Sequence, residues 1–527
     1  MNTLITRLYR FFRDSLIYLS LALFLLLNYL CIRYQVFITL TGEAVVVFNN
    51  GLLFFLLFFI IIFFIIKYGS KIDSISEKTL FIVLALIYII IGIYFIASAD
   101  TSLRDDAWLV YNDVLSFKSG NFESILPGNH LSYFPHQLGL ITYESLLLLF
   151  SANTRILFFA NLVWVILINF IMSKITKILI PEDSRAVKYT IILSFLFLPQ
   201  FFFILFAYGT VPGFLCFLTS LYFMFLYLTK KKWYHLLLNI LFITFACLLR
   251  QNYFIGAIAI MLIYVLNALR EKQFQNIAII AGILFSLTLS QNILGSFYSY
   301  QSGFVVGDGV PKILWIAMGL QDDADSDRTG GWFNDYAKRT YYESGYDTVV
   351  ASETAINNIL DRLDYFTHNI DDAYDFFKNK IISTWCDPLF QSVWSGPLKT
   401  RGQETYSPLL ANLYNGGMSY KIFAAFSNMF VCIIYLFSIV FLRLHTGKKK
   451  DTLNEYILVF PLFIIGTFFY HLFSETKSQY VYQAVFVLIP LAAQGISLVT
   501  KKNLGIDIKT SLANFKKTLS KTINHSC

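Results

Sequence analysis

The sequence predicts an all-α polytopic membrane protein with about twelve transmembrane helices and a small, mainly helical extracytoplasmic segment. Three observations carry this prediction. Of the 527 residues, 57% are hydrophobic and only 14% are charged, whereas soluble domains carry about 25% charged residues. The apolar residues lie in long blocks, and about 20 such residues cross a bilayer as a helix. Basic residues, which give the chain a net charge of +8, gather between alternate blocks, as the positive-inside rule expects.

Twelve apolar blocks are long enough to be predicted as membrane spans. The same composition excludes a chain of soluble domains, a collagen-like or disordered chain and a secreted protein built on disulfides. The predicted spans cover residues 14–33, 48–66, 79–98, 154–178, 187–207, 211–228, 234–249, 252–269, 276–295, 420–443, 455–474 and 479–499.

The basic segments between the spans fix the predicted orientation. All of them fall on one side of the membrane if the N-terminus is cytoplasmic, which also makes the C-terminus cytoplasmic. Residues 136–150 are apolar enough to cross, but a crossing there would invert every later loop. We therefore predict a helix at the outer interface for this stretch. The basic segments are Arg7/Arg10/Arg13, Lys67–Lys78, Lys174–Lys188, Lys230–Lys232, Arg270–Lys272, Lys448–Lys450 and Lys501/Lys502.

This orientation divides the chain into six predicted parts. The outer segment 296–419 has 16 acidic and 9 basic residues, a net charge of −7, and its residues 352–382 have the pattern of two amphipathic helices. The parts are 1–98 (a cytoplasmic N-terminal segment and spans 1–3), 99–153 (the first outer loop), 154–295 (spans 4–9), 296–419 (the extracytoplasmic segment), 420–499 (spans 10–12) and 500–527 (a basic cytoplasmic tail).

Carboxylates that could take part in chemistry follow the third predicted span directly. They are Asp100, Asp105 and Asp106. Partial desolvation near a membrane raises the pKa of a carboxylate and suits it to act as a base or a metal ligand. Taken alone, an Asp pair is more often a solvated turn that caps a helix, here one beginning at Ala107.

The residues around the acid pair favour a functional role over a solvated helix cap. An amphipathic helix at 107–118, a Gly/Asn turn and the run Tyr133-Phe-Pro-His-Gln-Leu-Gly139 follow the acid pair. This order resembles the first outer loop of GT-C glycosyltransferases, membrane enzymes that use polyprenyl-phosphate sugars. Within that superfamily it is similar to the bacterial branch related to protein O-mannosyltransferases and aminoarabinose transferases. We therefore expect a GT-C-like fold.

Further segments extend the resemblance over roughly residues 79–499. Residues 311–320, 330–334 and 378–388 look like the outer segment of Gram-positive members, and 469–499 looks like their last hairpin. Two features depart from the family pattern. The motif is Asp-Asp where this branch commonly has Asp-Glu, and it follows the third span where the family places it after the first.

The resemblance implies an inverting glycosyltransferase at the outer face of the cell membrane. A hydroxyl attacking the anomeric carbon needs a general base, whereas a leaving phosphate needs only positive charge. One carboxylate can therefore suffice, unlike the pair that a glycosidase uses. Asp105 and Asp106 are the two candidates for this catalytic base, and the sequence does not choose between them.

Seven further residues are candidates for binding the donor phosphate or the sugar. Each also has an ordinary structural reading: an Arg at a span end can reach the headgroups, Lys477 can lie on an exposed turn, and His136 can cap a helix. The candidates are Arg104, Tyr133, His136, Arg250, Glu475, Lys477 and Tyr480.

The expected partners are a polyprenyl-phosphate sugar donor, a glycan or lipid-linked acceptor of the cell envelope, and the membrane itself, with no nucleic acid. No metal-ligand set is visible, and a divalent cation is the one cofactor that the resemblance leaves open. Two other functions compete. A polysaccharide flippase tends to show internal repeats and intramembrane charges, which are scarce here. An O-antigen-type polymerase is associated with Arg-rich outer loops, whereas 296–419 is acidic.

Overall fold

The computed structural model describes residues 2–39, 42–272, 276–322, 328–396, 407–446 and 453–500. Over these residues the chain is mostly helical, and its one sheet is a two-stranded hairpin. Two of the predicted basic cytoplasmic segments, Lys448–Lys450 and the tail that contains Lys501 and Lys502, lie outside the described residues.

Ten of the described helices are long and apolar enough to cross a membrane, so the chain is a polytopic membrane protein. The predicted span 187–207 is a pair of helices bent by 51°, and the predicted span 234–249 is a shorter apolar helix. A total of twelve spans stays a prediction. The ten are α1 (Asn2–Arg33), α2 (Leu52–Tyr68), α3 (Glu77–Ser98), α7 (Arg155–Leu179), α10 (Thr210–Lys230), α12 (Tyr253–Glu271), α13 (Ile277–Ser302), α19 (Met418–Leu444), α20 (Val459–Phe473) with the turn η8 (Glu455–Leu458) before it, and α21 (Tyr482–Phe486) continued by α22 (Ile489–Thr500).

The bent pair is mostly buried in the bundle, whereas the short helix is buried on one face and exposed on the other. The pair consists of α8 (Ser184–Leu196) and α9 (Leu198–Phe202) with the turn η4 (Phe203–Leu205), and Pro199 stands at its break. Proline removes a backbone donor and clashes with the preceding turn, which explains the bend. The short helix α11 (Trp233–Leu249) packs against α10 and α13. Hydropathy marks such segments as spans but does not reveal the bend.

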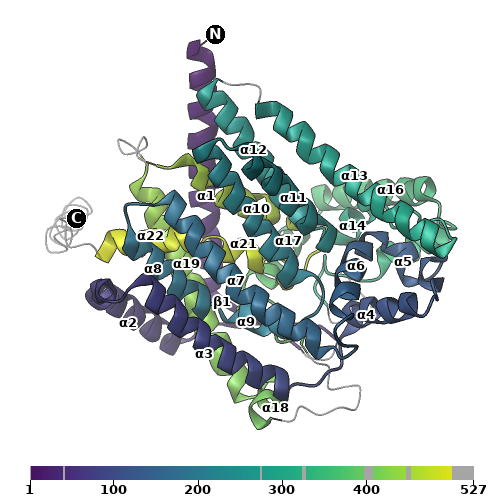
Figure 1. Cartoon of the computed structure of the whole chain (residues 1–527), viewed down its shortest axis with the longest axis horizontal. Coiled ribbons are helices and arrows are strands. Elements are labelled where there is room, and N and C mark those ends of the chain that lie inside the picture. The colour runs from purple at the N-terminus through teal and green to yellow at the C-terminus, as the bar shows by residue number, and fades with distance from the viewer. Residues whose placement is uncertain are drawn as a thin grey trace.

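Composition separates the central helices from the peripheral ones (Figure 1). Helix α2 carries Phe, Leu and Ile on all its faces. Most of these side chains are exposed, as expected for a helix in lipid. By contrast α19 and α22 carry Ser, Asn, Gln and Gly and are mostly buried against each other. Small residues allow such close packing. An added Cβ at Gly495 of α22 would lie 2.0 Å from the carbonyl oxygen of Phe437 in α19.

A β-hairpin between α1 and α2 departs from the predicted all-α fold. Strands β1 (Tyr34–Ile38) and β2 (Val45–Asn49) pair antiparallel, with Tyr34 opposite Asn49 and Ile38 opposite Val45. The sequence analysis began the second span at residue 48, and this boundary was wrong. An apolar run of β-branched residues has the same hydropathy whether it is a strand or the start of a span.

The outer elements agree with the amphipathic patterns in the sequence. Helix α4 (Asp105–Lys118) confirms the helix predicted at 107–118. The two helices predicted within 352–382 are α16 (Thr348–His368) and α17 (Ile370–Trp385). The short helix α6 (Leu138–Leu147) forms within 136–150 and is not among the candidate spans. The other helices of the two segments predicted to be outside are α5 (His130–Tyr133), α14 (Lys312–Gly319), α15 (Tyr336–Glu343) and α18 (Pro408–Tyr414).

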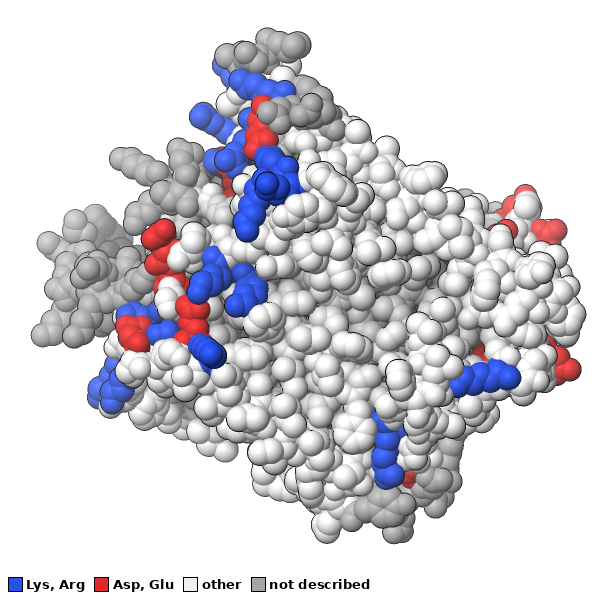
Figure 2. Space-filling view, viewed as in Figure 1, with Lys and Arg blue, Asp and Glu red and all other residues white. Residues whose placement is uncertain are grey.

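Charged side chains gather at two opposite parts of the surface, with a broad uncharged band between them (Figure 2). One charged region surrounds the N-terminal end of the chain at the upper left, and the other lies at the right, where α5 and α16 are found in Figure 1. A band without charges is what a helix bundle in lipid requires. Which end faces the cytoplasm stays a prediction from the basic residues.

The contact between α22 and α19 gives a test of the packing. Gly495→Ala should destabilise the protein by about 1–3 kcal/mol, because the new methyl group must displace a backbone carbonyl. Gly295→Ala in α13 is the matched control, because nothing lies within 4 Å of its added Cβ. Thermal unfolding midpoints of the two purified variants in detergent would measure the difference. Equal midpoints would contradict the packing of α22 on α19.

Candidate functional site

Asp106 and Arg250, which are 144 positions apart in the chain, meet on one tyrosine. The hydroxyl of Tyr208 donates a hydrogen bond to Asp106 Oδ2 at 3.2 Å and accepts one from Gln137 Nε2 at 2.7 Å. The Arg250 guanidinium donates to the backbone oxygen of Tyr208 at 2.8 Å and lies 4.9 Å from the centre of its ring. Tyr208, which is not among the candidate site residues of the sequence analysis, therefore connects a candidate base to a candidate phosphate ligand.

Backbone geometry explains why Tyr208 and Arg250 are neighbours. Helix α11 ends at Leu249, and the next residue is Arg250. The turn before α10 contains Gly209, which has a φ of +71° and lies so close to the α11 end that a Cβ would be 2.3 Å from Leu249 O. Glycine adopts this left-handed conformation without strain. The turn can thus press Tyr208 onto the end of α11.

The guanidinium of Arg250 is buried and has no carboxylate partner among the described residues. Its side chain is only 9% exposed. Besides Tyr208, its charge faces the ring of Tyr480, with 5.7 Å between the guanidinium carbon and the ring centre. Aromatic rings stabilise a guanidinium less than a carboxylate does. Such an arrangement is suited to receive an anion.

Glu475 and Tyr480, the latter in ring contact with Arg250, lie at the tip between α20 and α21. The Tyr480 hydroxyl donates to Glu475 Oε1 at 3.3 Å. The outer segment holds this tip in place, because Glu475 N donates to Trp315 O at 2.8 Å and Thr476 N to Gly331 O at 3.0 Å. Burial raises the pKa of Glu475 to about 7, although Lys477 opposes this rise.

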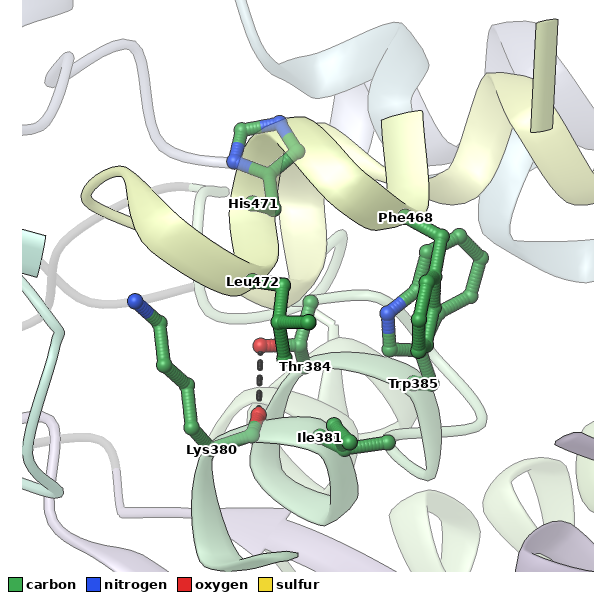
Figure 3. A pocket seen from close by; sticks show the side chains of 7 residues that line it. All are labelled: Lys380, Ile381, Thr384, Trp385, Phe468, His471 and Leu472. Carbon is green, nitrogen blue, oxygen red and sulfur yellow. Dashed lines mark hydrogen bonds between the residues drawn. The ribbon is translucent and has the colours of Figure 1, made fainter. Parts of the chain in front are cut away.

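Beneath the tip lies the small pocket of Figure 3, which α17 and the end of α20 enclose. Lys380 points from α17 toward the tip and donates hydrogen bonds to Gly319 O and, at 2.9 Å, to Ser474 O. The pocket has no room for a molecule as large as water. Lys380 therefore supports the tip and does not line a substrate cavity.

Lys477 is held by a carboxylate that the sequence analysis missed. Its ammonium lies 2.7 and 2.9 Å from the two oxygens of Glu43, which is 2% exposed. Arg328 approaches the same carboxylate at 2.9 Å. Glu43 stands in the turn between β1 and β2. An acid alone between two apolar blocks was the available signal, but nothing in the sequence connects it to Lys477.

The two acids of the motif have different surroundings. Asp105 is 61% exposed and lies 3.5 Å from Arg104 Nε. Arg104 in turn covers the ring of Trp394 at 3.7 Å, and Lys477 lies 5.5 Å from the same ring. Asp105 also has a φ of +42°, which is uncommon for a residue other than glycine. Asp105 thus belongs with Arg104 and Trp394, and Asp106 with Tyr208.

The remaining two candidates, Tyr133 and His136, have different surroundings. Tyr133 packs against Tyr341 and Tyr346 of the outer segment, and burial together with Tyr346 raises its pKa to about 12. This is a packing position. His136 is exposed, and desolvation together with the neighbouring charges of His130, Lys312 and Arg250 lowers its pKa to about 4. His136 is therefore neutral near pH 7 and lies within the field of Arg250.

In the part of the chain that the structure describes, no three His, Cys, Asp or Glu side chains lie close enough together to hold a metal ion. Comparison with known proteins gives no assignment either. No family model matches the chain, and no curated protein matches it. The geometry of the outer end is thus the basis for a functional interpretation.

The raised pKa of Glu475 predicts a pH-dependent contribution to stability. Because its pKa rises from an ordinary 4.5 to about 7 on folding, this contribution is present below pH 4.5 and is lost as the pH rises through 7. Glu475→Gln should therefore gain stability relative to the wild type between pH 5 and pH 8, by about 3 kcal/mol at most.

Thermal unfolding of both proteins at pH 5, 6.5 and 8 would measure this change, since other titrating groups cancel in the comparison. Glu353→Gln, which alters an exposed glutamate of α16, is the matched control and should keep a constant difference from the wild type. A constant difference for Glu475→Gln as well would refute the raised pKa.

Proposed function

We propose that the protein is an inverting glycosyltransferase of the cell membrane. It transfers a sugar from a polyprenyl-phosphate donor to a cell-envelope glycan or lipid-linked acceptor at the outer face. The observation that carries this proposal is the contact of Asp106 and Arg250 with one tyrosine, Tyr208. The resemblance of the outer loops to GT-C glycosyltransferases supports the same reaction.

Arg250 is suited to bind the donor phosphate. A buried guanidinium without a counter-ion is unfavourable, and a bound phosphate would supply the missing negative charge. Guanidinium and phosphate also match in geometry, because two N–H groups can donate to two oxygens. The neutral imidazole of His136, within the field of Arg250, could accept or donate a further hydrogen bond without adding charge.

Asp106 is the better placed of the two candidate bases. Its carboxylate is exposed, and the hydrogen bond from Tyr208 orients it toward the Arg250 side of the site. The acceptor oxygen would attack the anomeric carbon and release its proton to Asp106. The bond from that carbon to the phosphate oxygen would break, and Arg250 would stabilise the charge left on the polyprenyl phosphate. A single displacement of this kind inverts the anomeric configuration.

Substitution of the two acids tests the assignment of the base. Asp106→Asn should lower the rate of sugar transfer by about 100-fold or more, because general-base catalysis typically contributes about 100- to 10,000-fold. Asp105→Asn should have a smaller effect, since Asp105 pairs with Arg104. The assay is transfer of a radiolabelled sugar from polyprenyl-phosphate donors to envelope acceptors in membranes. Full activity of both variants would remove the assigned base, and absence of transfer by the wild type would favour a flippase.

Substitution of Arg250 tests the phosphate site. Arg250→Gln should weaken binding of undecaprenyl phosphate by about 100-fold, since hydrogen bonds to charged groups contribute about 1.5–3 kcal/mol each. Arg270→Gln on the opposite end of α12 is the control, because its partner is Glu455. Equilibrium binding to both purified variants in detergent measures the effect. Equal affinities would exclude Arg250 as the phosphate ligand.

A further inference from the structure

A row of polar side chains runs along an exposed face of α13. Thr288, Asn292 and Ser296 follow one another at a spacing of four residues, Gln291 lies beside Asn292, and all four are exposed. Residues four positions apart lie on the same face of a helix. None of the four side chains makes a hydrogen bond within the described part of the chain. We call Thr288, Asn292 and Ser296 with Gln291 the polar row.

The polar row lies within the membrane-spanning length of α13. The helix begins at Ile277, and a rise of about 1.5 Å per residue puts Asn292 roughly 22 Å further along it. This depth is inside a hydrocarbon layer of about 30 Å. Toward the other end, the ring centre of Tyr298 lies 5.5 Å from that of Phe117 in α4, and its hydroxyl lies 3.0 Å from Thr142 Oγ1 in α6. Asn292 is about 9 Å along the helix from Tyr298, so it lies deeper in the bilayer than these contacts with the first outer loop.

Lipid is an unfavourable neighbour for the polar row. A polar side chain in hydrocarbon costs free energy when it has no hydrogen-bond partner. Helix α2 has the composition that suits lipid, because its exposed side chains are mostly Phe, Leu and Ile. The opposite face of α13 is apolar, since Ile279, Ile283 and Leu287 are buried where the helix packs against α11 and α12. At the edge of the molecule, α13 thus turns its polar side away from the bundle (Figure 1), where a protein surface can satisfy it.

We propose that this protein surface is α13 of a second copy of the chain, in a symmetric dimer whose two polar rows face each other. Copies in one membrane share the same orientation, so a two-fold axis along the membrane normal places each residue of the row at the depth of its counterpart. The Asn292 carboxamide both donates and accepts hydrogen bonds and can therefore pair with its own copy. No charged residue occurs between Ile277 and Ser302, so the two faces meet without repulsion. The dimer does not depend on the proposed function.

The test measures dimer formation by the full-length protein in liposomes. Each copy carries one fluorophore at the C-terminus, and photobleaching steps are counted at a series of protein-to-lipid ratios. The wild type should change from one step to two as its density in the membrane rises. Asn292→Leu should raise the dissociation constant of the dimer by about tenfold, because the hydrogen bonds between the two carboxamides are lost. Ser296→Leu should also raise it, since a larger side chain in the row keeps the two helices apart.

Gln301→Leu is the matched control, because it replaces a carboxamide on the same helix. Gln301 is exposed but lies beyond the predicted span, and it is on the opposite side of the helix from Asn292. The dissociation constant of this variant should equal that of the wild type. Both test variants place an apolar side chain on an exposed face of a span, so the monomer should keep its fold, which thermal unfolding in detergent checks.

Three results would overturn the proposal. In the first, the wild type stays monomeric at every protein-to-lipid ratio, so that a second copy is not the neighbour of the polar row. In the second, neither Asn292→Leu nor Ser296→Leu changes the dissociation constant. In the third, Gln301→Leu weakens the dimer as much as they do, so that the effect does not belong to the polar row. If one test variant does not fold, the result for the other decides.

Discussion

The bilayer accepts neither an unpaired backbone group nor an unpaired charge in its hydrocarbon layer, and this constraint shapes the whole chain. Helices satisfy the backbone internally, which is why most of the described residues are helical. On the face that Figure 2 shows, charged side chains gather toward two parts of the surface, and a broad uncharged band separates them. Polar chemistry is therefore concentrated at those parts, where few ionisable groups are present and each can be considered individually.

At the end of the bundle that contains the candidate site, several cations have specific carboxylate partners. Glu43 pairs with Lys477 and Arg328, and Asp105 pairs with Arg104. Arg250 differs, because two tyrosine rings and a backbone oxygen surround it in place of a carboxylate. Desolvation makes such a charge costly. In the proposed site, Arg250 therefore offers a place for an anion, and the exposed carboxylate of Asp106 lies beside it.

The outer segment and the hairpin act as supports for this site. The segment holds the tip between α20 and α21 through backbone hydrogen bonds to Glu475 and Thr476. Lys380 of α17 also donates a hydrogen bond to the backbone oxygen of Ser474. The hairpin is joined to the same segment at Cys386. A site built on several supported elements keeps its geometry better than one on a single loop. The hairpin between α1 and α2 thus contributes to the site through Glu43.

The sequence by itself determined the membrane class, most of the spans and the outer amphipathic helices, because hydrophobic blocks and periodic patterns are local properties. It also singled out Asp106 and Arg250, since few charges lie near the predicted outer face. It could not show that Tyr208 joins them, that Glu43 holds Lys477, or that Tyr133 packs in the outer segment. These contacts link residues up to several hundred positions apart, and only the tertiary structure brings them within bonding distance. The hairpin was missed for another reason: a valine-rich strand and the beginning of a span are equally hydrophobic, and the difference between them lies in which backbone partners are available.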